Sequence, residues 1–135
     1  MTKPRWRQQA EWLFWANVWP ERHTPLGRLL WQAGFNSTMG GVILFGYQRP
    51  ELCLLLLAAL LAASIWVHGR WSAFFAALCG LSGWGMEVWF ALAGPVWVFT
   101  AVEGWNPTGI PLYMAIGWAM VGLFCMSLAD YLRSR

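Results

Sequence analysis

Glu87 is the first candidate for chemistry in this sequence. It is the only charged residue between Trp71 and Gly94, a stretch that is otherwise almost wholly apolar. A carboxyl group inside a membrane span is costly to bury and usually faces a bundle interior or a polar cavity. In its acid form such a group could donate a proton to an alkene or carry a proton across the membrane. The alternative is an interhelical hydrogen bond that fixes the register of two helices.

A second carboxyl group, Glu103, is the other catalytic candidate. It lies between Trp97 and Trp105, in the connection that follows the Glu87 segment. There it could close the outer end of a cavity as the partner of Glu87. The alternatives are full solvation or an ion pair with a neighbour such as Arg49.

The helical face that carries Glu87 is made of small residues. Gly80, Gly83, Ala91 and Gly94 recur with Glu87 at helical spacing. Small side chains allow a second helix to approach closely. Glu87 is therefore expected to face another helix rather than lipid. By depth in the membrane, the expected hydrogen-bond partners are three polar residues near the middle of the first span, which are Asn36, Ser37 and Thr38.

Two tryptophans lie deep in predicted spans, beside glycines. Trp84 follows Gly83, and Trp118 follows Gly117. Deep indole rings either pack in the core or line a slot for a flat or elongated apolar ligand. If such a slot exists, the candidate ligand-binding residues are Asn36, Gly80, Gly83, Trp84 and Trp118.

The sequence offers little for a metal or a cofactor. The three cysteines, Cys53, Cys79 and Cys125, lie in apolar stretches and form no CxxC pair, which predicts free thiols. His68, beside Trp66, is either a polar interface residue or a ligand for a porphyrin-type metal. The sequence contains no phosphate-binding glycine loop, nucleophile elbow or HExxH helix. No cofactor follows from it.

The composition points to lipid as the solvent of this chain. It is 59% hydrophobic and 11% charged, whereas soluble domains are about 25% charged. Apolar runs predict spans over 25–47, 51–67, 71–94 and 110–128. Thr24 and Pro25 form a favourable helix start. We therefore predict an all-α integral membrane four-helix bundle over residues 24–135, in which the run 51–67 is featureless and faces lipid.

The apolar run within residues 1–23 is too short to cross a bilayer. A basic start precedes the tryptophan-rich stretch WLFWANVW at 12–19. Such a segment suits a short interfacial helix in the headgroup zone. Docking on a partner protein is the equal alternative.

Charge placement predicts the orientation. Cytoplasmic loops of membrane proteins are enriched in lysine and arginine. With four crossings, the side that holds both termini also holds eight of the nine basic residues: Lys3, Arg5, Arg7, Arg22, Arg28, Arg70, Arg133 and Arg135. Only Arg49 lies opposite. Both termini are therefore expected to be cytoplasmic, in a bacterial inner membrane. The scattered basic residues do not indicate a nucleic-acid partner.

Glu87 and the segment GIPLYMAIGWAM at 109–120 also carry a resemblance. A membrane glutamate, an outer connection with Gly and Pro, then Gly-Ile-Pro-Leu and a helix with Trp-Ala resemble small polytopic carotenoid-biosynthesis proteins. These are the carotenoid hydratase and lycopene-cyclase-like membrane families. Bacterial four-helix inner-membrane proteins of uncharacterised function have a similar layout. The resemblance covers roughly residues 80–125 and implies an isoprenoid or pigment ligand.

Three functions remain open from the sequence. The first is an accessory or structural subunit of a larger membrane complex, with membrane lipid, other subunits or further copies of the chain as partners. The second is a protein or enzyme that binds an isoprenoid or lipid and uses Glu87. The third is a small proton-coupled transporter, which would need a homo-oligomer to build its path.

Overall fold

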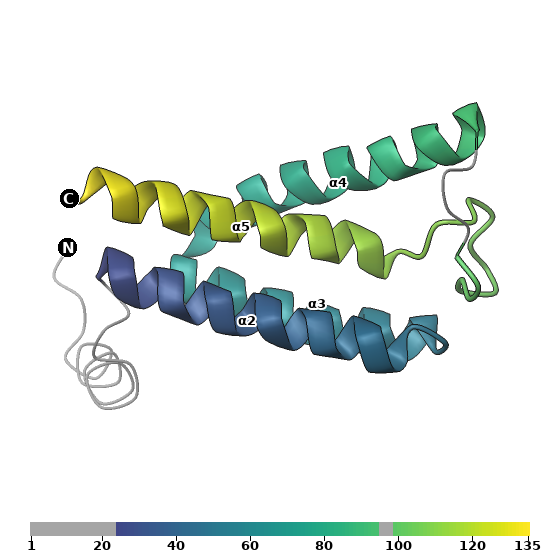
Figure 1. The fold of residues 1–135 in the computed structure, drawn as a ribbon, viewed down its shortest axis with the longest axis horizontal. Helices are drawn as coiled ribbons and strands as arrows, with labels where there is room; N and C mark the ends of the chain where they lie inside the picture. The colour runs from purple at the N-terminus through teal and green to yellow at the C-terminus, as the bar shows by residue number, and fades with distance from the viewer. Residues whose placement is uncertain (1–23, 95–98) are drawn as a thin grey trace, which may run out of the picture.

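Four helices and one long connection make up the described part of the chain (Figure 1). The computed structural model describes residues 24–94 and 99–135, so the predicted interfacial segment 1–23 lies outside the described residues. The helices are α2 (Pro25–Gly46), α3 (Pro50–His68), α4 (Arg70–Ala93) and α5 (Tyr113–Arg133). The described residues contain no strand. The all-α prediction is therefore confirmed for this part of the chain.

Local signals set most of the helix ends. The Thr24 hydroxyl accepts a hydrogen bond from the Gly27 backbone N–H at 3.0 Å, and Pro25 occupies the first turn of α2. Pro50 likewise begins α3. Gly69 ends α3 with a φ of +93°, a conformation that favours glycine, and its N–H donates to Ile65 O at 2.7 Å. One residue thus separates α3 from α4.

The four helices run alternately up and down, and α5 lies at the centre of the packing (Figure 1). One apolar cluster joins α3 to α5 through Cys53, Leu57 and Tyr113. A second cluster joins α4 to α5 through Ala76, Ala119 and Leu123. Helix α4 packs mainly on α5 and has few contacts with α3. Much of the α4 surface therefore faces outwards.

Three of the helices are long and apolar enough to cross a membrane: Pro50–His68, Trp71–Ala93 and Tyr113–Arg133. Helix α2 is of similar length, but its polar residues set it apart from these three. They are Arg28, Gln32, Asn36, Ser37 and Thr38. Ser37 and Thr38 donate back to carbonyls of their own helix, at 2.9 and 3.0 Å. Their hydroxyl groups are thereby satisfied within α2.

The last helix departs most from its predicted range of 110–128. It begins at Tyr113 because Ile110, Pro111 and Leu112 belong to a hydrogen-bonded loop. It ends at Arg133 because no glycine or proline interrupts the sequence after Leu128. The other three helices begin and end within one residue of the predicted spans.

Candidate functional site

Glu87 lies in the interface between α4 and α5. Its side chain is 7% exposed. The indole Nε1 of Trp118 donates a hydrogen bond to Glu87 Oε1 at 3.3 Å. The second carboxyl oxygen, Oε2, is buried and has no hydrogen-bond partner. One oxygen of this carboxyl group is therefore engaged in helix packing, and the other is unsatisfied.

The small residues near Glu87 bring α5 close to α4. A Cβ atom added at Gly83 would lie 2.2 Å from Cγ of Trp118. A Cβ atom at Gly80 would lie 2.8 Å from the carbonyl oxygen of Ala115. Real Cβ atoms do not approach other atoms this closely, so both positions require glycine. The predicted close helix contact on this face is confirmed, and its partner is α5.

The two deep tryptophans, Trp84 and Trp118, differ in their contacts. The Trp118 ring itself covers Gly83. Trp84 lies one turn before Glu87, and its Nε1 atom is buried without a hydrogen-bond partner. The Trp118 indole thus packs against α4 in the interface between α4 and α5.

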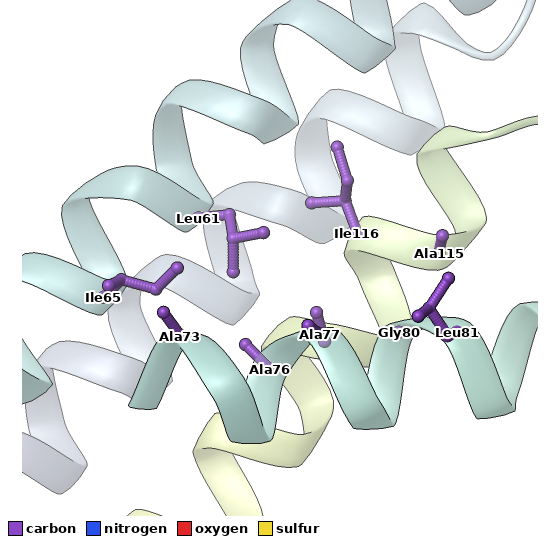
Figure 2. A pocket seen from close by; sticks show the side chains of 10 residues that line it. Leu61, Ile65, Ala73, Ala76, Ala77, Gly80, Leu81, Ala115 and Ile116 are labelled. Carbon is purple, nitrogen blue, oxygen red and sulfur yellow. The ribbon is translucent and has the colours of Figure 1, made fainter. Parts of the chain in front are cut away.

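A groove of about 400 Å³ lies elsewhere, between α3, α4 and α5 (Figure 2). Of the candidate ligand-binding residues, only Gly80 lines it. Its other lining residues are all apolar: Leu61, Ile65, Ala73, Ala76, Ala77, Leu81, Ala115, Ile116 and Ala119. Ala77 and Leu81 are exposed, so the groove opens on the side of the bundle.

Asn36 does not have the expected partner. Its side-chain amide donates to the carbonyl oxygen of Gln32 at 2.9 Å and to that of Met120 at 3.4 Å. The hydrogen bond to Glu87 comes from Trp118 instead. The prediction of an Asn36–Glu87 bond was wrong because α2 packs on α3 and α5 and does not contact α4, which carries Glu87.

A buried polar link joins α2, α3 and α5. Gln32 and Ser64 are both fully buried. The Ser64 hydroxyl donates to Gln32 Oε1, and Gln32 Nε2 donates to Met120 O at 3.2 Å. Helix α3 is therefore not the featureless helix expected from its sequence. Buried polar groups of this kind must be paired, and here each satisfies the next.

His68 extends this link towards the α3–α4 turn. Its Nδ1 donates to Ser64 O at 2.9 Å, since a carbonyl oxygen can only accept. Its Nε2 lies 2.5 Å from the hydroxyl oxygen of Ser127 on α5. The Ser127 hydroxyl also lies 2.9 Å from Leu123 O, so its single proton is donated either to that carbonyl or to the ring nitrogen. His68 therefore ties α3 to α5, beyond the polar interface role expected from sequence.

Arg28 and Asp130 close the same end of the bundle. The guanidinium of Arg28 on α2 lies 3.7 Å from the carboxylate of Asp130 on α5. Both side chains are partly exposed, and exposed ion pairs typically contribute less than about 1 kcal/mol. The ion pair therefore contributes little to stability, although it joins the start of α2 to the end of α5.

Glu103 organises the connection before α5. It is 1% exposed, and its carboxylate accepts hydrogen bonds from Leu112 N at 2.9 Å and from Asn106 Nδ2 at 3.1 Å. Asn106 in turn donates to Ile110 O at 2.8 Å and accepts from Thr108 N at 3.0 Å. A carboxylate at a helix start is favoured by the helix dipole. Glu103 is thus neither solvated nor engaged with Arg49.

The structure does not bring the two catalytic candidates into one site. Glu87 bonds to Trp118 within the α4–α5 interface, whereas Glu103 bonds within the loop ahead of α5. Among residues 24–94 and 99–135, no three His, Cys, Asp or Glu side chains lie together as metal ligands would. The cysteines of this part are free thiols.

The link that joins Gln32, Ser64 and Ser127 through His68 was not predicted from the sequence. A usable signal existed, because Ser64 and Ser127 are isolated polar residues within long apolar runs. In a membrane, such residues are often interhelical hydrogen-bond donors.

No known protein family, curated protein or solved structure matches this chain.

Proposed function

We propose that the protein is a small multi-pass membrane protein that acts as an accessory subunit of a larger membrane complex. In this proposal all four helices cross a bacterial inner membrane, and both termini lie on the cytoplasmic side. The apolar character of α3, α4 and α5 supports the membrane location. The distribution of basic residues supports the orientation.

One observation carries the accessory role: each candidate carboxyl group has a separate structural task. Glu87 accepts from Trp118, and Glu103 holds the start of α5 through Leu112 N. Catalysis requires an acid, a base or stabilising group, and a shaped site in one place. The two glutamates do not supply that combination, which favours a protein whose polar groups hold helices together.

The outward face of α4 is the surface on which a partner subunit would pack. Large apolar side chains are exposed along it: Trp71, Phe74, Leu78, Leu81, Met86, Trp89, Phe90 and Leu92. Gly85 lies on the same helix and has open space where a Cβ would be. A glycine on an exposed helix face lets a neighbouring transmembrane helix approach closely. We assign this surface to contact with another subunit.

Purification of the tagged full-length chain from native membranes in a mild detergent tests this role. Wild-type protein should carry one or more companion proteins at a constant ratio. Gly85→Leu should lose them, because the added side chain projects into open space and blocks only an approaching helix. Gly40→Leu is the matched control on α2, where the space beyond the glycine is also open. Wild-type protein without any companion at constant ratio would contradict the accessory role.

The groove between α3, α4 and α5 favours a second candidate function, the binding of an isoprenoid or another lipid. Its volume of about 400 Å³ falls within the roughly 300–1,000 Å³ of small-molecule pockets. Lipid mass spectrometry of the same preparation tests this function. A defined lipid should accompany the wild-type chain and be lost in Ala77→Phe, which fills the groove from its open side.

A further inference from the structure

Two buried polar atoms on α4 lack hydrogen-bond partners, and they are complementary. Glu87 Oε2 is an acceptor without a donor, and Trp84 Nε1 is a donor without an acceptor. An unpaired buried polar atom destabilises the structure that buries it. The other carboxyl oxygen of Glu87, Oε1, already accepts from Trp118, so the packing of α4 on α5 does not require Oε2 to remain unpaired.

The two atoms belong to one turn of one helix. Trp84 and Glu87 are three residues apart, and residues at this spacing are neighbours on a helix surface. Gly80 precedes Trp84 by four residues and therefore lies on the same side of α4. Gly80 lines the apolar groove, so one groove residue lies a single turn before Trp84 on this side of α4.

We propose that Trp84 and Glu87 bind the hydroxyl group of a lipid alcohol whose hydrocarbon chain lies in the groove. A hydroxyl group is both a donor and an acceptor. It donates its proton to Glu87 Oε2 and accepts from Trp84 Nε1, so one group satisfies both atoms. This site rests on the second candidate function, in which the groove holds a lipid.

The position along α4 fits an amphipathic molecule. Glu87 precedes the last residue of the helix, Ala93, by six positions, or about 9 Å along the axis. The groove residues Ala73 to Leu81 lie on the other side, towards the α3–α4 turn. The hydroxyl group therefore lies nearer one membrane surface, and the chain extends inwards from it.

Binding of radiolabelled farnesol, a 15-carbon isoprenoid alcohol, to the full chain in lipid nanodiscs tests the site. Farnesol should bind saturably, and its methyl ether, which cannot donate a hydrogen bond, should bind about tenfold more weakly. 1-Hexadecanol is the acyl-chain counterpart. Equal binding of the two alcohols would indicate a site for lipid alcohols of both kinds. A preference for farnesol would indicate a site for isoprenoid alcohols. Both results support the site.

Two substitutions remove one hydrogen bond each. Trp84→Phe removes the indole N–H and keeps an aromatic ring. Glu87→Gln replaces Oε2 by an amide nitrogen while the other oxygen can still accept from Trp118. Each should weaken farnesol about tenfold. Glu87→Gln should leave binding of the methyl ether within about twofold of wild type, because the ether has no hydrogen to donate to Glu87. Trp84→Phe should weaken the ether as well, because the ether oxygen can still accept from the indole N–H. Trp105→Phe, at an exposed tryptophan in the connection before α5, is the control and should change the binding of neither probe.

The outcomes separate the hydroxyl site from the groove. Equal wild-type affinities for farnesol and its methyl ether would overturn the site, as would unchanged farnesol binding in Trp84→Phe and Glu87→Gln. In those cases bound water satisfies the two atoms. If both probes still bind and Ala77→Phe abolishes their binding, the groove function stands without the hydroxyl site. If neither probe binds the wild-type chain, both fail.

Discussion

The Trp118 indole on α5 lies over Gly83 on α4 and donates a hydrogen bond to Glu87 Oε1 at 3.3 Å. The Trp118 ring can lie against α4 because Gly83 has no Cβ. Its N–H then reaches the carboxyl group of Glu87, one turn further on. The α4–α5 interface therefore depends on all three residues together. It fixes both the separation of the two helices and their register.

Gly83→Ala should destabilise this interface by about 1–3 kcal/mol, because the new Cβ collides with the Trp118 ring. Gly85→Ala is the matched control on the same helix, since nothing lies within 4 Å of its added Cβ. The better helix propensity of alanine is common to both variants. Unfolding in mixed detergent micelles measures the free-energy difference. Equal stability of the two variants would show that α5 does not pack on Gly83.

Gln32→Leu should cost about 1–3 kcal/mol, because it leaves the buried Ser64 hydroxyl and the Met120 carbonyl with fewer partners. Thr38→Val is the control, since the Thr38 hydroxyl is exposed and bonds only within α2. Its cost should stay below about 0.5 kcal/mol. The same unfolding measurement applies. If the Gln32→Leu variant were as stable as Thr38→Val, the hydrogen bonds of Gln32 would not stabilise the fold.

Glu103→Ala should loosen the loop and the start of α5. Leu112 N and Asn106 Nδ2 lose their carboxylate acceptor, at a cost of about 1–3 kcal/mol. Amide exchange at Leu112, followed by mass spectrometry, should become faster. Glu51→Ala in the first turn of α3 is the control, because Glu51 is exposed. Unchanged exchange near Leu112 would contradict the assignment of Glu103 to this loop.

Helix positions followed from the sequence because they depend on local features. The Thr24–Pro25 start and the Gly69 end mark α2 and α3 without reference to the rest of the chain. The start of α5 did not follow, because Ile110 and Leu112 are held by Asn106 and Glu103 through contacts that span several residues.

The polar contacts between helices were the least predictable part of the candidate site. Asn36 bonds to Met120 and not to Glu87 because α2 is a neighbour of α5 and does not contact α4. Which helices become neighbours is set by the packing of the whole bundle, and no local pattern in the sequence indicates it. The close approach at Gly80 and Gly83 could be predicted, because small residues at helical spacing are sufficient to indicate it.

Counting the membrane crossings is the most direct test of the proposed four-span topology. The crossing at issue is α2, because it is more polar than the other three helices. Single cysteines at Thr2→Cys, Gln48→Cys and Arg135→Cys, in a chain whose native cysteines are changed to alanine, can be labelled in sealed vesicles with an impermeant maleimide. Four crossings predict that the Thr2→Cys and Arg135→Cys variants react from the cytoplasmic side and Gln48→Cys from the other. Reaction of Thr2→Cys and Gln48→Cys from the same side would show that α2 does not cross the membrane.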